Sequence, residues 1–307
     1  LTSQGKFMEA EALYRQIRAT SRAELGENHP ITLGVMYSLG QLLFQKRELS
    51  EAEQLMRKVV AAREARFYSN HTKTLDATNM LAMILCEQTK FAEAETLYRK
   101  VISNQVAKFG ANHPDTLITK HNLASLFLRQ GRHGEAQHMC RKVLAGKKAK
   151  LGVDHPRTLR TMGLYAKILT SLNRYAEAEI VQRQVLATVR TQQGRQHQDY
   201  MFALDDLSTT LTAQCKLDEA EQLRREAYNV AQQKFGVEND ITLHRLMGLG
   251  MILALRQKWS EAETALQAAV DGLRKIYGTS HRRTVVVTNQ LRKLLDARQQ
   301  LQQLNGQ

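Results

Sequence analysis

Six histidines at regular spacing are the first residues in this 307-residue chain whose type could support metal chemistry, since histidine is the commonest transition-metal ligand. They are His29, His71, His113, His155, His197 and His281, separated by multiples of 42 residues. A 42-residue spacing puts each in a different repeat, roughly 10 Å from the next, too far apart to share one ion. We therefore expect these histidines to pack within the connectors between repeats and to cap helix ends there. The sequence predicts no metal and no cofactor.

A second phased set places arginine four residues after glutamate, the favourable orientation for an ion pair on a helix. The pairs are Glu11–Arg15, Glu53–Arg57, Glu95–Arg99, Glu179–Arg183 and Glu221–Arg225, while Arg141 has the same phase without the glutamate. These arginines could also form a phosphate-binding ladder. We expect exposed structural pairs instead, contributing about 0.3–0.5 kcal/mol each.

Motifs of known catalytic chemistry do not occur in the chain: there is no GxxxxGK[ST], GxGxxG, HExxH or GxSxG. The acidic residues recur at the repeat spacing instead of converging, so the sequence predicts that the chain is not an enzyme. Cys86, Cys140 and Cys215 lie far apart and form no CxxC pair, which favours a reducing, cytoplasmic location.

The whole sequence repeats with one period. The triplet Glu-Ala-Glu or a close variant begins at Glu9, Glu51, Glu93, Glu135, Glu177, Glu219 and Glu261, always 42 residues apart. Within one unit, 116–150, apolar residues fall on two helical faces either side of Gly131. Each unit is therefore expected to be a helix, a turn and a helix, stacked without insertions as an all-α solenoid.

Small residues mark where the two helices of a unit should approach closely. An alanine in the second helix recurs as Ala52, Ala94, Ala136, Ala178, Ala220 and Ala262, and twelve residues before it stand Gly40, Ala82, Ala124, Ala166, Ser208 and Gly250. Between them, at the expected start of the second helix, lie Leu49, Phe91, His133, Tyr175, Leu217 and Trp259. We expect the side chains of this last set to wedge between the paired helices.

This pattern resembles the tetratricopeptide repeat, in the 42-residue form of the kinesin light chain type. The motifs G-x-x-H-P-x-T-L, N-L-A-x-L and E-A-E-x-L-Y-R-K-V carry the resemblance, most clearly at 91–102 and 113–144. It covers about the whole chain and implies a right-handed α-solenoid of stacked antiparallel helix pairs.

The repeat pattern also predicts the organisation of a single array. Residues 1–28 should form a partial repeat that opens with the tail of a first helix, 29–280 six full repeats, and 281–307 a capping helix and tail. We expect Arg292 to face water in the capping helix and the glutamine-rich residues 299–307 to fray. Because the sequence opens inside a repeat, we expect a fragment of a longer protein.

The first helices of such an array line its concave face, where residue identities differ between units. The peptide-binding residues predicted there are Asn79, Met83, Ile118, His121, Asn122, Arg129, Arg160 and Lys167. Asparagine can bind a peptide backbone through both a donor and an acceptor, and the cations can pair with carboxylates. The resemblance implies cargo peptides with Trp or Tyr beside acidic residues, and it assigns Asn122 to this surface. Asp205 and Asp206 add negative charge further along.

The charge balance agrees with an acidic partner, because 44 Lys and Arg oppose 30 Asp and Glu for a net charge of +14. We predict a non-enzymatic scaffold or adaptor that binds an acidic peptide or protein with apolar anchors. Two alternatives stay open: a basic nucleic-acid-binding array, and a regulatory or structural subunit of a larger enzyme or assembly. The longest apolar run, 246–255, is about half of what a membrane span requires.

Overall fold

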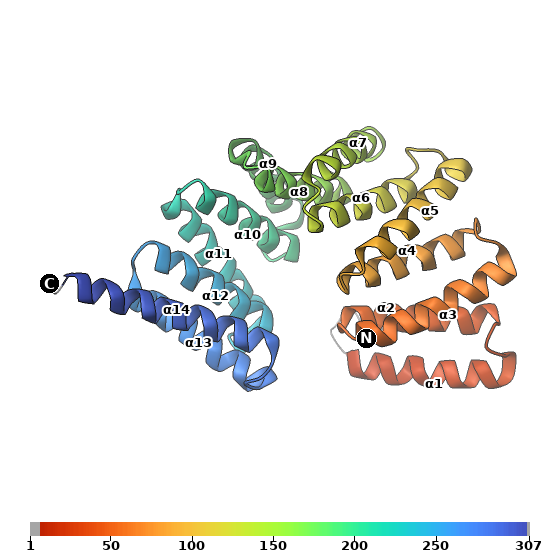
Figure 1. Cartoon of the computed structure of the whole chain (residues 1–307), viewed down its shortest axis with the longest axis horizontal. Coiled ribbons are helices and arrows are strands. Elements are labelled where there is room, and N and C mark those ends of the chain that lie inside the picture. Colours follow the sequence, from red (N-terminus) through yellow and green to blue (C-terminus); the bar gives the residue numbers. More distant parts are fainter. Residues whose placement is uncertain (1–6, 306–307) are drawn as a thin grey trace. The chain divides into compact units, whose positions relative to one another are not determined.

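The structure, a computed structural model, describes the backbone of residues 7–305 and the side chains of 7–300 and Gln303. This part of the chain contains helices and no strands (Figure 1). Six helices of 16 residues are α2 (Pro30–Gln45), α4 (Thr72–Glu87), α6 (Pro114–Arg129), α8 (Pro156–Ser171), α10 (Gln198–Ala213) and α12 (Asp240–Leu255). Seven helices of 19 residues are α1 (Phe7–Leu25), α3 (Leu49–Phe67), α5 (Phe91–Phe109), α7 (His133–Leu151), α9 (Tyr175–Gln193), α11 (Leu217–Phe235) and α13 (Trp259–Tyr277).

The chain divides into two compact units, unit 1 (Leu1–Thr161) and unit 2 (Met162–Gln307). In unit 1 each helix from α1 to α7 packs against the next, and in unit 2 the same holds from α9 to α14. The first helices of successive repeats also touch, α2 with α4 and α4 with α6. Each unit is therefore an all-α repeat solenoid, as predicted, while the repeat boundaries drawn from the sequence stay a prediction.

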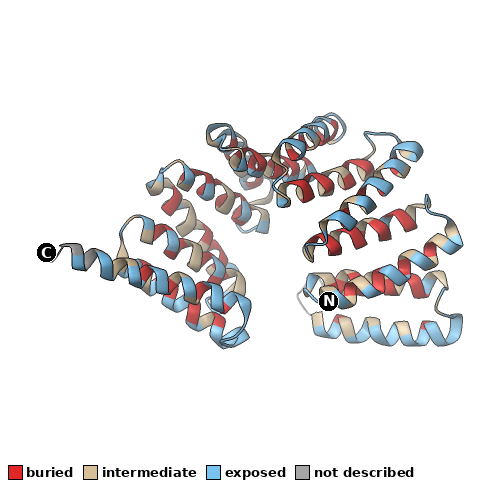
Figure 2. Cartoon of the chain, viewed as in Figure 1, coloured by how far each residue is buried: buried red, intermediate tan, exposed pale blue. Residues whose placement is uncertain are grey.

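Each helix has a buried and an exposed side, and the buried sides face neighbouring helices within each unit (Figure 2). The six phased alanines of the second helices are fully buried. Where the opposite position is glycine, there is no room for a side chain: a Cβ on Gly40 would lie 2.3 Å from Met56 Cε, and one on Gly250 2.8 Å from Leu266 Cγ. The predicted close approach of the paired helices is confirmed.

In each repeat, the residue that we expect to wedge between the paired helices lies at the first position of the second helix, as predicted. Helices α3, α5, α7, α9, α11 and α13 begin at Leu49, Phe91, His133, Tyr175, Leu217 and Trp259. The preceding turn contains a residue at positive φ in each repeat, between 59° and 75°, which reverses the chain in a few residues.

The phased histidines cap the first helices, as expected. In each of the six, Nδ1 accepts a hydrogen bond from the backbone N–H two residues later, at 3.1–3.3 Å. Asn239 occupies this position in the remaining connector, and its Oδ1 accepts from Ile241 N at 2.9 Å. Three histidines also stack on the aromatic residue that ends the previous helix, including His113 on Phe109 at 4.6 Å. The histidines thus satisfy backbone donors that a helix start leaves open.

All five predicted Glu–Arg pairs form, at 2.8–2.9 Å. They differ from the expectation in one respect: the arginine is exposed, but the glutamate side chain is only 6–18% exposed. Each glutamate also binds a second cation, which lies in the turn before the next second helix. Lys216, for example, lies 2.8 Å from Glu179. Hydrogen bonds from Lys216 and Arg183 lower the pKa of Glu179 to about 2, against burial. These carboxylates tie consecutive second helices together.

The last helix is α14 (Arg282–Asn305). Residues 299–305 belong to this helix, and the fraying of its end stays a prediction. Arg292 is exposed, as expected for the outer side of a cap. Residues 306–307, and the first-helix tail predicted before Phe7, lie outside the described residues.

A strained connector residue gives a first prediction. The helix-ending position is glycine at six connectors, such as Gly110 at φ 93° and ψ 163°, but it is Tyr68 at φ 67° and ψ 163°. Tyr68→Gly should raise the free energy of unfolding by about 1–3 kcal/mol, because only glycine adopts this region without strain.

The reciprocal change tests the same strain at the next connector. Gly110→Tyr should lower stability by a similar amount, although no atom beyond the adjoining residues lies within 4 Å of the added Cβ. Urea unfolding of both variants is the measurement, and equal midpoints for the two would contradict the strain argument.

The histidine caps give a second prediction. His197→Ala should cost about 0.5–2 kcal/mol of unfolding free energy, because Asp199 N–H loses its acceptor, now 3.2 Å away. His197→Asn should keep most of this stability, since the side chain of Asn239 accepts the equivalent hydrogen bond in another connector. Urea unfolding compares them, and equal losses in both variants would show that the side-chain cap contributes nothing.

Candidate functional site

The candidate site lies on the first-helix surface of unit 1, by which we mean the half-buried and exposed side chains of α2, α4, α6 and residues 156–161. Seven of the eight predicted residues belong to it: Asn79, Met83, Ile118, His121, Asn122, Arg129 and Arg160. The eighth, Lys167, lies in unit 2. The predicted binding residues are therefore divided between unit 1 and unit 2.

An asparagine pair joins α4 to α6 at the middle of this surface. Asn122 Nδ2 donates to Asn79 Oδ1 at 3.3 Å, and both residues are half-buried. The amide N–H2 of Asn79 and Oδ1 of Asn122 have no partner within the described residues, so the pair offers a donor and an acceptor side by side. Half-buried Met83 lies one turn after Asn79, and Ile118 one turn before Asn122.

Arg129 is already paired within the protein. Its guanidinium donates to Glu87 Oε1 at 2.7 Å and contacts Cys86 Sγ at 3.3 Å. Glu87 also accepts a hydrogen bond from Arg47. These contacts link the carboxyl ends of α2, α4 and α6, so Arg129 is a bridge between repeats before it is a ligand contact.

His121 belongs to a buried polar network. Its Nδ1 lies 3.2 Å from Thr161 Oγ1, which accepts a hydrogen bond from Lys147 Nζ at 2.9 Å. Burial, with the nearby charges of Lys147 and Arg160, lowers the pKa of His121 to about 3, so its imidazole is neutral. Burial and Arg160 also lower the pKa of Lys147, to about 8. At neutral pH a largely charged ammonium therefore lies directly below the surface.

Arg157 and Arg160 are exposed cations at this end of the surface. The charge of Arg160 acts on both His121 and Lys147. Arg160 forms no ion pair with any residue that the structure describes in unit 1, so together with buried Lys147 it makes the potential at this end of the surface positive.

In unit 2 the negative charge expected from Asp205 and Asp206 is neutralised, which corrects that expectation. Lys167 pairs with Asp206 at 3.1 Å. Asp205 binds two arginines, Arg224 at 2.8 Å and Arg245 at 3.1 Å. Two guanidinium groups share one carboxylate, so this part of unit 2 has a surplus of positive charge.

Sequence reasoning missed Arg224, Arg245 and Lys147 because they do not lie on the face it considered. A signal was present, because each occupies a position that is buried in other repeats. Arg224 is in phase with Met56 and Tyr98, and Arg245 with Ala77, Thr119 and Ala203, all of them buried. A cation in a buried phase of a regular repeat marks a local polar network.

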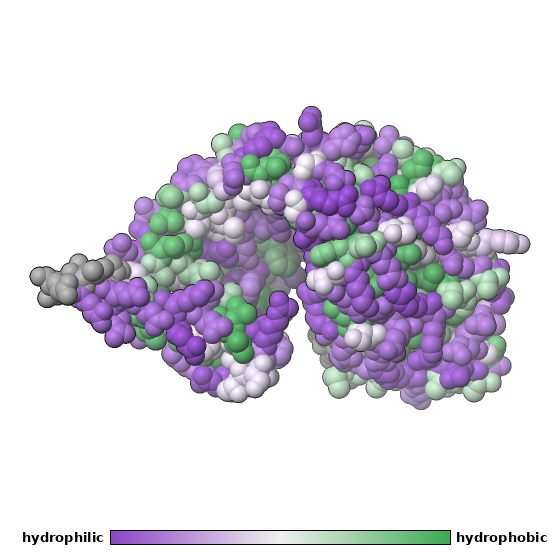
Figure 3. Space-filling model, viewed as in Figure 1, coloured by the Kyte–Doolittle hydropathy of each residue, from purple (hydrophilic) through white to green (hydrophobic). Residues whose placement is uncertain are grey.

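No set of three or more His, Cys, Asp or Glu side chains within the described residues is placed to hold a metal ion. None of the described helices is long and apolar enough to cross a membrane. The visible surface is mostly hydrophilic, with small apolar patches between (Figure 3).

The chain belongs to the tetratricopeptide repeat family. The model of this family, described as "Tetratricopeptide repeat", matches residues 1–65, 73–149, 121–191 and 199–275. Repeats of this family make the chain a protein–protein interaction scaffold. No curated protein sequence matches the chain significantly.

Solved structures share the fold. A putative kinesin light chain from Podosopora anserina with nearly identical TPR-like repeats is 23% identical, with a TM-score of 0.56 over 66% of this chain and 95% of that one. BtubC (BKLC) from P. vanneervenii is 18% identical, with a TM-score of 0.59 over 80% and 92%. A tetratricopeptide repeat protein from Parabacteroides merdae is 14% identical, with a TM-score of 0.63 over 96% and 94%. The resemblance to kinesin light chain-like repeats is thereby confirmed for the fold.

The buried ammonium of Lys147 gives a third prediction. Its pKa is lowered from 10.5 to about 8 in the folded chain, so between these pH values the unfolded chain binds a proton that the folded chain does not. The stability of the wild type should therefore rise, relative to that of Lys147→Met, as the pH increases from about 8 to 10.5. Urea midpoints at pH 7, 8.5 and 10 measure the difference; a constant gap between the two proteins would contradict it.

Proposed function

We propose that this scaffold binds an extended acidic peptide with apolar anchors on the first-helix surface of unit 1. The observation that carries the proposal is the Asn79–Asn122 pair, which lies between two first helices with an open donor and an open acceptor. An extended backbone presents the complementary acceptor and donor, and such contacts do not depend on the ligand's side chains.

Apolar and charged neighbours give this binding mode its selectivity. Met83 and Ile118 are half-buried beside the asparagines, where an aliphatic or aromatic side chain of the peptide gains burial. Exposed Arg160 and buried Lys147 favour a carboxylate on the same peptide. Arg129 contributes less than expected from the sequence, because Glu87 already neutralises it.

The location that suits this function is intracellular. Cys86, Cys140 and Cys215 are all free thiols, two of them buried. Unpaired cysteines are typical of proteins in reducing compartments.

The test is peptide binding by variants of the asparagine pair. A displayed library of 12-residue peptides rich in Asp and Glu, each with one aromatic residue, supplies the probe, and fluorescence anisotropy measures the selected peptide. Asn79→Ala with Asn122→Ala should weaken binding at least about tenfold, or 1.4 kcal/mol, because two backbone contacts are lost. Arg160→Glu should weaken it by a similar factor and reduce its salt dependence.

Lys58→Glu on α3 is the matched control, since Lys58 is an exposed cation of unit 1 outside this surface and the change in charge is the same. Its affinity should stay within about twofold of the wild type. Unchanged affinity in the asparagine double variant would overturn the proposal. Displacement of the peptide by single-stranded nucleic acid with tighter binding would favour the nucleic-acid alternative instead.

A further inference from the structure

Lys147 has a buried amine whose chemistry the proposed function does not use. The residue is only 4% exposed. Its Nζ donates to Thr161 Oγ1 at 2.9 Å and to the backbone oxygen of Arg157 at 3.4 Å. Within the part of unit 1 that the structure describes, no carboxylate forms an ion pair with it. Burial of an ammonium without such a partner is costly, which sets this lysine apart from the exposed ones.

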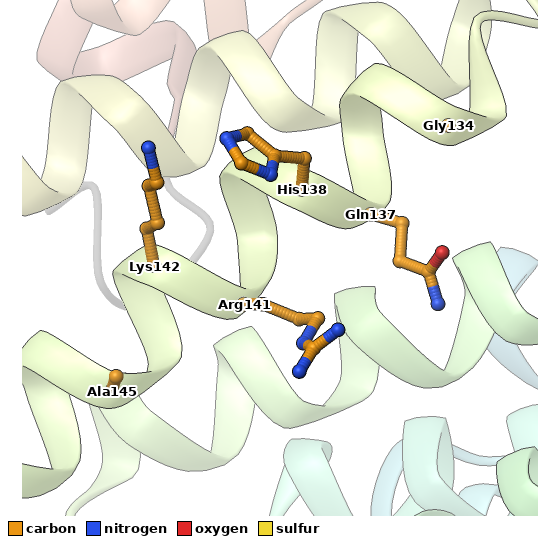
Figure 4. Close-up of a pocket in the computed structure, with 6 residues that line it drawn as sticks. All are labelled: Gly134, Gln137, His138, Arg141, Lys142 and Ala145. Carbon is orange, nitrogen blue, oxygen red and sulfur yellow. The ribbon is translucent and has the colours of Figure 1, made fainter.

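The other long polar side chains of the same part of α7 point outward. Gln137, His138, Arg141 and Lys142 line a hollow of about 570 Å³, but they project to opposite sides of the helix (Figure 4). These side chains do not converge on one group. The nitrogen of Lys147 lies instead between packed helices, in a polar network that joins α7 to the start of α8.

The repeat does not require an amine at this position. Arg63, the equivalent residue of α3, donates to the backbone oxygens of Lys73 and Leu33, at 2.7 and 3.5 Å. The residues in phase with Lys147 are Ser21, Arg63, Gln105, Val189, Ala231 and Leu273, all of them buried. Because a hydroxyl, an amide or an aliphatic group occupies the same place in other repeats, folding leaves the amine of Lys147 free for chemistry.

The surroundings of this amine oppose a positive charge. Burial, together with the charges of exposed Arg160 and Arg157, lowers the pKa of Lys147 to about 8. Burial raises the pKa of the Cys140 thiol to about 12 and lowers that of His121 to about 3, so both are neutral. From α6, α7 and the start of α8, the amine therefore faces an imidazole, a thiol and two guanidinium charges. Such surroundings favour a negative charge at Nζ over a positive one.

The free amine is the form of lysine that attacks electrophiles. With a pKa of about 8 in place of the ordinary 10.5, the share of free amine at neutral pH is roughly 300 times larger. Burial keeps bulky and charged reagents away from Nζ, so the electrophile must be small and neutral. Carbon dioxide meets both conditions, and its product with an amine is an anion.

We propose that Lys147 binds carbon dioxide as a carbamate. The ammonium first loses a proton to solvent. The lone pair of the amine then forms a bond to the carbon of CO₂, one C=O electron pair moves onto oxygen, and the amine releases a second proton to solvent. No group is oxidised or reduced. The charges of Arg157 and Arg160, which oppose the ammonium, stabilise the carbamate, and the Thr161 hydroxyl is a donor for its oxygens.

This reaction is independent of peptide binding. It involves the amine below the first-helix surface of unit 1 and none of the asparagine, methionine or isoleucine contacts proposed for the peptide. Carbamate formation and peptide binding can therefore fail separately.

The test detects the new bond directly by NMR. The full chain, labelled with ¹⁵N at the lysine side-chain nitrogens, is titrated with ¹³CO₂ at constant neutral pH. We expect a carbamate ¹³C signal that is split by coupling to ¹⁵N and that saturates with CO₂. The label separates lysine carbamates from one at the chain's α-amino group. Ethylation with triethyloxonium traps the carbamate as a stable ester, and mass spectrometry should place this ester on Lys147.

Three variants test the role of the surroundings. Lys147→Gln should abolish the split signal and should fold, since Gln105 occupies the same place in the preceding repeat. Arg160→Gln should lower the carbamate occupancy at least about threefold, because Arg160 keeps the amine free and stabilises the product. Lys148→Gln is the matched control: it removes an exposed amine from the adjacent position of α7, and the occupancy should change less than about twofold.

The proposal fails if the wild type gives no split signal that saturates with CO₂, or if the trapped ester lies on other lysines and not on Lys147. Persistence of the full signal in Lys147→Gln would contradict it in the same way. Equal occupancy in the wild type and in Arg160→Gln would overturn the electrostatic reason for the reaction.

Discussion

The close approach of the two helices in each repeat is the constraint on which the rest of the structure depends. The alanines are fully buried, and an added Cβ at the partner positions Gly40 and Gly250 would lie within 3 Å of a side chain. Because small residues recur at both positions in each repeat, the repeats pack with a turn and a connector of the same length, which explains the absence of insertions over the 42-residue period. Buried Thr32 and Thr116, together with the histidine caps, then satisfy polar groups that short connectors leave open.

Electrostatics divides the surface of the scaffold into two kinds. On most second helices, each glutamate binds an arginine from its own helix and a cation from the turn before the next second helix. Arg15 and Arg183 also bind Glu51 and Glu219 of the next second helix, so these cations have carboxylate partners within the repeat pattern. On the first helices of unit 1, the Asn79–Asn122 pair and Arg160 have no such ion-pair partner within the described residues of that unit. A regular fold makes these departures visible, because each residue has equivalents at the same place in other repeats. Binding sites are expected where the pattern breaks, since folding does not require the break.

The fold could be predicted almost completely from spacing, because the period of 42 and the small residues define which helices pack. The contacts of the candidate site could not. Arg129 with Glu87, and Asn122 with Asn79, join residues 42 and 43 positions apart, so their pairing depends on the distance between repeats. The pattern of a single helix face shows these residues only as independent donors, because it contains no information on contacts between repeats.

The most direct test of the central claim, that a uniform scaffold presents its ligand-binding residues on the first helices, is photo-crosslinking. The acidic peptide selected by binding is made with benzoylphenylalanine in place of its aromatic residue, and crosslinked positions in the full chain are identified by mass spectrometry. The account predicts crosslinks on α4 and α6, near Met83 and Ile118, that disappear in the Asn79→Ala, Asn122→Ala variant. Crosslinks confined to the second helices α3, α5 and α7, unchanged in that variant, would contradict it.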